Sequence, residues 1–189
     1  MSEHPILFSG EMVRAILDGK KTQTRRIVKP QPFEGPDEIK CELYCPTIIR
    51  GDTEEPGDEV FGFANENEGW KCPYGQPGDT LWVRETWAPS DAPENHANAK
   101  IGYTYRADWD NADDEDVRDF AWHPSILMPH RASRIILLNK DIRVQRLQEI
   151  SEGDAEAEGC KGFYSPRHPD AGSTDGQLPS EEFRFLWNS

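Results

Sequence analysis

The apolar stretches of this chain are short, and two long segments rich in proline, glycine and acidic residues separate them. Regular structure is predicted in three core pieces, 5–30, 76–88 and 131–159, with insertions at 31–75 and 89–130. Insertions of this length are uncommon within one domain and usually carry function or are mobile. The chain has 189 residues, enough for one core with such insertions, so we expect a single domain over 1–189.

Local patterns predict a small set of strands and helices. Met12, Val13 and Ile16 recur at helical spacing ahead of Gly19, which predicts a helix over 10–18. Later helices are predicted to start at Ser151, which has Asp154 three positions on, and at Ser180; Gly159 should end the first of these. Strands are predicted at 5–8, 80–85, 132–138 and 140–147, with shorter candidates at 47–49, 60–64 and 101–106.

This order of elements lacks regular strand–helix–strand spacing. It therefore predicts an α+β fold with a small, curved, mixed or antiparallel sheet or barrel and peripheral short helices. No apolar run approaches the length of a membrane span, and the N-terminus lacks the pattern of a secretion signal, so we expect no membrane association and a cytoplasmic protein.

The net charge of −14 disfavours broad, non-specific nucleic-acid binding, which depends on neutralising phosphates. The charge is uneven, however. Residues 1–30 hold six basic and three acidic side chains, and residues 131–148 hold five and one. If these islands meet in the fold they form a local anion-attracting site; otherwise they are solvated faces of unrelated elements.

Four cysteines in an apparently intracellular chain do not predict disulfides. The Cys41-x₃-Cys45 spacing, together with Cys72, is compatible with zinc if Cys160 or a histidine (His96 or His123) supplies a fourth ligand. No clean second pair follows, so free buried thiols are the favoured interpretation, and we expect neither a metal nor a cofactor.

The segment Gly19-Lys20-Lys21-Thr22-Gln23-Thr24-Arg25-Arg26 fits the motif G-x-K-x-x-x-x-R at Gly19, Lys21 and Arg26. With the preceding helix and the later stretch 78–83 (GDTLWV), it resembles the ASCH domain family of the PUA-like superfamily, in particular phage- and prophage-type members. The resemblance covers about half the chain and implies a PUA-like small β-barrel. The family's usual final apolar strand has no counterpart after residue 159, so either this is a truncated form or the sheet keeps an open edge at which another chain can pair.

One enzymatic relative in this family is the N4-acetylcytidine amidohydrolase, whose catalytic pattern is a lysine, a threonine three residues on and a later glutamate. Lys21 and Thr24 match the first two, and Glu158 is the best match for the third, with Glu156 as a substitute. The resemblance implies a hydrolase in which Lys21 is the base, Thr24 the nucleophile and Glu158 the proton shuttle. A threonine hydroxyl needs such a base, and burial or nearby cations can lower the pKa of a lysine enough for it to serve.

The geometry of that segment decides whether such chemistry is available. In a regular strand Lys21 and Thr24 would point to opposite faces, so they converge only if the chain turns after Gly19. A ribonuclease-like ASCH enzyme, and a non-catalytic phage protein that binds a protein partner through its acidic loops, remain open alternatives.

A binding function without catalysis needs less: cations to hold phosphate and an aromatic face to stack a base. The partner would then be a nucleoside or RNA. Trp82, Trp87 and Trp122 are candidates for stacking, although most tryptophans occupy core positions. Arg84 and Arg134 can line the same cleft or pair instead with Glu85 or other acids. The candidate substrate-binding residues are Gly19, Lys20, Arg25, Arg26, Trp82, Arg84 and Arg134.

Overall fold

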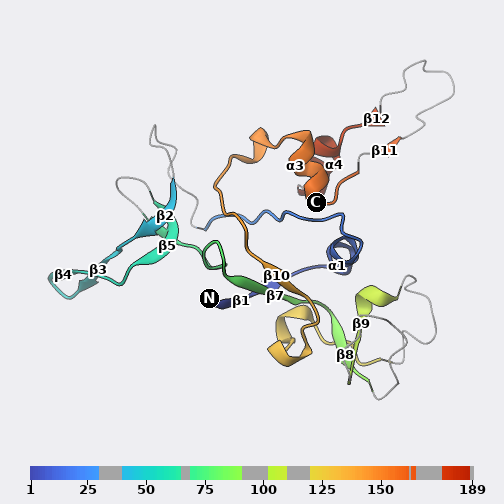
Figure 1. Cartoon of the computed structure of the whole chain (residues 1–189), viewed down its shortest axis with the longest axis horizontal. Helices are drawn as coiled ribbons and strands as arrows, with labels where there is room; N and C mark the ends of the chain where they lie inside the picture. Colours follow the sequence, from blue (N-terminus) through green and yellow to red (C-terminus); the bar gives the residue numbers. More distant parts are fainter. Residues whose placement is uncertain are drawn as a thin grey trace. The chain divides into compact units, whose positions relative to one another are not determined.

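The computed structural model describes residues 1–29, 40–64, 69–90, 102–109, 120–161, 163–164 and 176–187. The chain forms two compact units. The strand unit comprises Met1–Gly10 and Phe33–Val144, and the helical unit comprises Glu11–Pro32 and Gln145–Ser189 (Figure 1). None of the helices described here has the length and apolar character needed to cross a membrane.

The strand unit contains a mixed three-stranded sheet in the order β1-β7-β10. Strand β7 (Thr80–Arg84) lies parallel to β1 (Glu3–Leu7) and antiparallel to β10 (Ile136–Leu138). Along β7 the buried residues alternate, with Leu81 and Val83 facing the core. The predicted strands at 5–8 and 80–85 are thus confirmed in β1 and β7.

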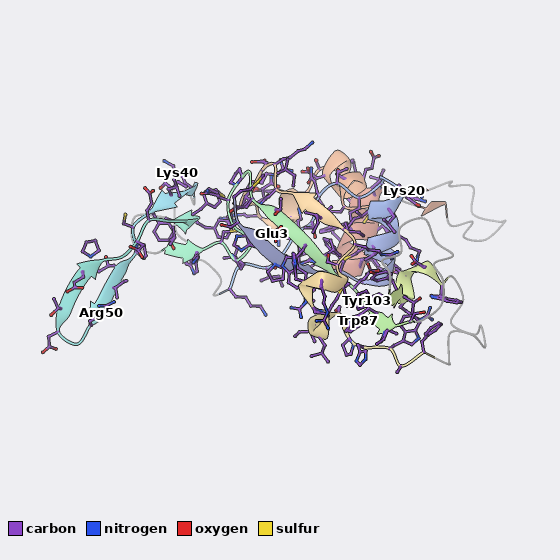
Figure 2. The ribbon with its side chains drawn as sticks, turned by 60° about the horizontal axis from the view of Figure 1, so that its bottom comes forward. Glu3, Lys20, Lys40, Arg50, Trp87 and Tyr103 are labelled. Atoms are coloured by element: carbon purple, nitrogen blue, oxygen red, sulfur yellow. The ribbon has the colours of Figure 1, made fainter. Side chains whose placement is uncertain are left out.

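A second, antiparallel sheet lies inside the segment predicted as the first insertion. It has the order β2-β5-β6, formed by β2 (Lys40–Tyr44), β5 (Val60–Ala64) and β6 (Gly69–Lys71). Between β2 and β5 the chain makes an exposed hairpin of β3 (Thr47–Arg50) and β4 (Thr53–Pro56), with Arg50 near its tip (Figure 2). The strand candidates at 47–49 and 60–64 are confirmed.

Glycine is required where β5 and β6 meet. A Cβ at Gly62 would lie 2.0 Å from the carbonyl oxygen of Trp70, and one at Gly69 would lie 2.5 Å from the ring of Tyr44. The Tyr44 ring therefore packs across both glycines, and a side chain at either position would separate the strands.

A third pair, β8 (Trp87–Pro89) with β9 (Tyr103–Tyr105), packs against short 3₁₀ turns at Arg106–Asp108, Ser125–Leu127 and His130–Ala132. Tyr105, Met128 and Ala132 form a buried cluster there. The strand candidate at 101–106 is confirmed in β9.

Two predicted strands in the last core piece need correction. The strand over 132–138 is shortened to β10, because residues 130–132 form a 3₁₀ turn. The strand over 140–147 is wrong, although its alternation of burial is present: Ile142 and Val144 are half-buried between exposed neighbours. The described residues give this segment no ladder partner, and a strand needs one.

The helical unit contains α1 (Gly10–Leu17), α3 (Glu152–Ala157), α4 (Pro179–Trp187), a 3₁₀ turn at Leu147–Glu149 and the short pair β11 (Phe163–Tyr164) and β12 (Gly176–Gln177). The helices predicted at 10–18 and after Ser151 are confirmed, and the Ser151 hydroxyl accepts the Asp154 N–H at 3.2 Å. The core of the unit consists of Ile150, Ala155, Cys160 and Phe183.

Ser180 does not cap the last helix as predicted. It lies buried inside α4, where its N–H (3.0 Å) and its hydroxyl (2.5 Å) both donate to the Glu152 carboxylate. The hydroxyl thus joins α4 to the start of α3. Taken over the described residues, the fold is α+β with several small sheets and short helices and without a closed barrel.

Candidate active site in the helical unit

The segment after α1 is held between the ends of two helices. Gly19 has a φ of 70° and ends α1, and the N–H groups of Lys20 and Lys21 both donate to the Ala15 carbonyl at 2.9 Å. The next two N–H groups, of residues 22 and 23, donate to the Ala157 carbonyl at the end of α3, at 2.8 and 2.9 Å. The chain therefore turns after Gly19 and follows two helix ends instead of entering a regular strand.

Lys21 forms a buried ion pair with Glu158. Its Nζ donates to Glu158 Oε2 at 2.5 Å and to the Glu158 carbonyl at 2.7 Å. The two side chains are only 3% and 6% exposed. Glu156, the alternative third residue, is exposed. Of the two glutamates that the sequence offered, the structure therefore brings Glu158 to Lys21.

Glu158 takes this position because α3 ends there. The next residue, Gly159, has a φ of 99°, a left-handed conformation that glycine adopts without strain and that commonly ends a helix. A Cβ at Gly159 would meet the Cβ atoms of Ala15 and Lys21 at 3.5 and 3.7 Å, so this helix end packs closely on α1 and on the segment that follows it.

Burial lowers the pKa of Lys21 below its ordinary value of 10.5, and the hydrogen bond and charge of Glu158 oppose this shift. The positive charge of Arg26 lowers it further. Removal from water is the main cause of this shift, and cationic crowding contributes less. Lys20 is exposed and pairs with Asp18.

Arg25 completes a four-charge cluster around the ion pair. Its guanidinium lies 3.3 Å from Glu158 Oε1 and 3.3 Å from Asp154 Oδ2, and it stacks over the Phe183 ring of α4 at 5.7 Å. It also donates to Gln145 Oε1 at 3.3 Å. Two cations and two carboxylates balance, which is what a largely buried cluster requires.

Thr24 and Arg26 are half-buried and touch each other. Arg26 Nη1 donates to Thr24 Oγ1 at 3.0 Å and to the Arg25 carbonyl at 2.9 Å. A cationic donor on a hydroxyl oxygen stabilises negative charge developing there. The Thr24 hydroxyl therefore lies beside a group that favours its conversion to an alkoxide-like nucleophile.

The Lys21–Glu158 contact can supply a base and an acid together. If the proton moves across the 2.5 Å contact, the ion pair becomes a neutral amine beside a neutral carboxylic acid. Burial favours the neutral lysine of this form, because it penalises the charge of the Lys21 ammonium. A neutral lysine is a base and a neutral glutamic acid is a proton donor.

The remaining predicted binding residues belong to the strand unit. Arg134 is 3% exposed and makes a bidentate pair with Glu85, both contacts at 2.9 Å, and a further contact to Asp108 at 2.7 Å. Its guanidinium also lies over the Tyr105 ring at 4.0 Å. Burial raises the pKa of Glu85, which is 1% exposed, against the effect of Arg134. The internal pairing of Arg134 with Glu85, one of the two roles considered for it, is confirmed.

Arg84 stacks over Trp82 at 5.3 Å, and Trp82 meets His130 edge-on at 5.0 Å. Trp87 of β8 stacks on His123 at 4.9 Å and meets the ring of Tyr103 of β9 at 5.6 Å (Figure 2).

Trp122 is likewise occupied by neighbouring side chains: Phe120 lies 5.4 Å away and Arg106 lies over its ring at 6.0 Å. These tryptophans are all half-buried.

The four cysteines are free thiols. Cys72 and Cys160 are buried, as predicted, whereas Cys41 is half-buried and Cys45 is exposed. Burial raises the pKa of Cys41, Cys72 and Cys160, which keeps these thiols protonated and unreactive. Within the described part of the chain no three metal-ligating side chains gather; His96 lies outside it.

Three partners of the site were not identified from the sequence: Asp154, Gln145 and Phe183. Asp154 stands four residues before Glu158, so both carboxylates lie on one face of α3, and this spacing was a usable signal. Phe183 comes from α4 and had no local signal. Comparison of the chain with protein-family models, with curated proteins and with solved structures gives no match.

Proposed function

We propose that this chain is an ASCH-type, PUA-like domain that binds a pyrimidine nucleoside and hydrolyses an N4-acyl amide of the N4-acetylcytidine type. One observation carries the proposal: a lysine and a glutamate 137 residues apart in sequence form a buried contact of 2.5 Å. Thr24 lies three residues beyond that lysine, as in the amidohydrolase pattern. The turn after Gly19 and the mixed sheet β1-β7-β10 support the same assignment.

In the first half of the proposed reaction, the neutral Lys21 amine takes the proton of the Thr24 hydroxyl as its oxygen attacks the acyl carbonyl. The Arg26 guanidinium, already at 3.0 Å from Thr24 Oγ1, stabilises the negative charge of the tetrahedral intermediate. Glu158, neutral after the proton shift, gives its proton to N4 of the base as the C–N bond breaks. Cytidine leaves and the acyl group stays on Thr24 as an ester.

In the second half, a water molecule attacks that ester. The Glu158 carboxylate accepts a proton from the water as the water oxygen bonds to the acyl carbon. The ester C–O bond then breaks, the Lys21 ammonium gives its proton to the Thr24 oxygen, and the carboxylic acid leaves with Lys21 and Glu158 neutral again. Proton transfer by a positioned side chain contributes about 10²–10⁴-fold to such a reaction.

The chain offers a matched neighbour for each proposed catalytic residue. Lys21→Met, Thr24→Val and Glu158→Gln are compared with Lys20→Met, Thr22→Val and Glu156→Gln, which are exposed residues of the same type in the same segments. Cytidine released from N4-acetylcytidine is measured by chromatography. The proposal predicts turnover that falls by at least about 10²-fold in the first set and by less than about threefold in the second.

Absence of turnover in the wild type, or equal losses in both sets, would contradict the proposed chemistry.

A second candidate, nucleoside or RNA binding without turnover, is favoured by the double engagement of the Lys21 ammonium, which donates to both the side chain and the carbonyl of Glu158. A lysine held in this way can serve the structure alone. Short RNAs titrated at two salt concentrations test this candidate, since phosphate contacts make affinity fall as salt rises. Analysis of the same mixtures for cleaved RNA tests a ribonuclease activity.

A further inference from the structure

Arg25 was a candidate for holding substrate, but its surroundings give it another task. Among the described residues its polar contacts are to Glu158 and Asp154 of the α3 segment and to the exposed Gln145, each at 3.3 Å. Its flat face is covered by Phe183 of α4, and its side chain is 17% exposed. Four partners fix one guanidinium, which leaves little of it to bind a ligand.

The contact between Arg25 and Glu158 determines which carboxylate oxygen faces Lys21. Glu158 Oε1 accepts from Arg25, so Oε2 is the oxygen that remains for the Lys21 ammonium. A carboxylate held at both oxygens cannot rotate away from either partner. Arginine suits this task because its planar fork can engage Glu158 and Asp154 together, as a lysine could not.

We propose that Arg25 is a positioning residue: it fixes the Glu158 carboxylate against Lys21 and, balanced by Asp154, sets how firmly Lys21 holds its proton. The kinetic part of this inference rests on the proposed hydrolase reaction, whereas the electrostatic part does not. Helix α4 also helps to hold Arg25, because Phe183 lies in the core of the helical unit and its ring packs under the Arg25 guanidinium.

The charges that act on Lys21 come from every element around it. Glu158, Arg26 and Cys160 act on the pKa of Lys21 directly. Arg25 and Asp154 act through Glu158, because Arg25 contacts both the Glu158 and the Asp154 carboxylates. Removing the positive charge of Arg25 leaves Asp154 and Glu158 acting on Lys21 uncompensated, which favours the protonated amine. Removing the negative charge of Asp154 has the opposite effect. The two substitutions must therefore shift the titration of Lys21 in opposite directions.

The test follows the titration of the lysine side chains by NMR in the full chain with isotope-labelled lysine, the Lys21 signal being assigned with Lys21→Arg. We expect Arg25→Gln to raise the pKa of Lys21 by about one unit and Asp154→Asn to lower it. Arg25→Lys keeps the charge but cannot engage Glu158 and Asp154 together, so its Lys21 titration should fall between those of the wild type and Arg25→Gln. Arg146→Gln, an exposed arginine of the same unit, is the matched control and leaves the titration unchanged.

An unchanged Lys21 titration in Arg25→Gln, or a rise in Asp154→Asn, overturns the proposal. If Arg25→Gln does not fold, the direction of the Asp154→Asn shift decides alone. Kinetic measurements distinguish the positioning role of Arg25 from the proposed hydrolysis. Opposite titration shifts without any hydrolysis keep the positioning role and remove the reaction. With hydrolysis, Arg25→Gln lowers kcat about tenfold near neutral pH and changes KM by less than about twofold.

Discussion

Replacing both members of the Lys21–Glu158 pair should destabilise the helical unit much less than the two single replacements suggest. Lys21→Met leaves the Glu158 carboxylate buried with one cation, Arg25, at 3.3 Å instead of two. Breaking a buried pair costs about 3–5 kcal/mol when one charge is left without compensation, and the remaining cation reduces this to about 2 kcal/mol.

The reverse replacement costs more. Glu158→Met leaves the Lys21 ammonium with only the Glu158 carbonyl, so we expect a loss of about 3 kcal/mol. The double replacement removes both charges and lets two apolar side chains meet. It leaves Arg25 with Asp154 as its one carboxylate partner among the described residues, so the free energy of unfolding should again fall by about 2 kcal/mol. The coupling energy of the pair is then about 3 kcal/mol.

Hydrogen exchange of the Thr22 and Gln23 amides measures this cycle, because both donate to the Ala157 carbonyl and so report on the helical unit itself. Exchange rates converted to opening free energies in the four proteins give the coupling directly. Single effects that add to within about 0.5 kcal/mol would refute the reasoning, since the two side chains would then stabilise the unit independently.

Three further predictions concern stability. Arg134→Met leaves the carboxylates of Glu85 and Asp108 without the Arg134 cation. Urea unfolding should then show a free energy of unfolding lower by about 3–5 kcal/mol. The free energy of unfolding of the wild type, relative to that of Lys21→Met, should rise with pH between the lowered pKa of Lys21 and 10.5. In that pH range the unfolded chain binds more protons than the folded one, and urea titrations across the range test the sign. Gly153→Ala should stabilise α3 by about 0.5–1 kcal/mol in thermal melts, because a Cβ added at this position meets no atom within 4 Å. Gly159→Ala should destabilise α3 by about 1 kcal/mol or more, because the φ of 99° at this position strains an alanine.

The parts of the fold that could be predicted from the sequence are those set by neighbouring residues. Ser151 caps α3 because its hydroxyl reaches an N–H three residues away, and Gly159 ends α3 because it adopts a left-handed conformation. Both causes lie within one helical turn and are visible in the sequence. The segment 140–147 failed because alternation predicts burial, while a strand also requires a partner from a distant part of the chain.

Within the candidate site the same division holds. Lys21 belongs to a local motif, but Thr24 and Glu158 came only from a resemblance, and two glutamates fitted the last position. The ion pair resolves the choice through a contact across 137 residues. Arg134 shows the converse: an arginine in a basic segment suggests a ligand site, and only the fold shows that Glu85 and Asp108 already occupy it.

The proposed reaction requires that Thr24 becomes acylated and that Lys21 and Glu158 transfer the protons. Trapping that ester is the decisive experiment: the wild-type protein is mixed with N4-acetylcytidine, quenched in acid during turnover and mapped by peptide mass spectrometry, because Glu158→Gln lacks the acid that forms the ester. The proposed reaction predicts an acetyl group on Thr24 in the wild type and in Thr22→Val, and none at this position in Thr24→Val. Release of cytidine by a protein whose Thr24 never carries the acetyl group, or acetylation of Lys21 in its place, would contradict it.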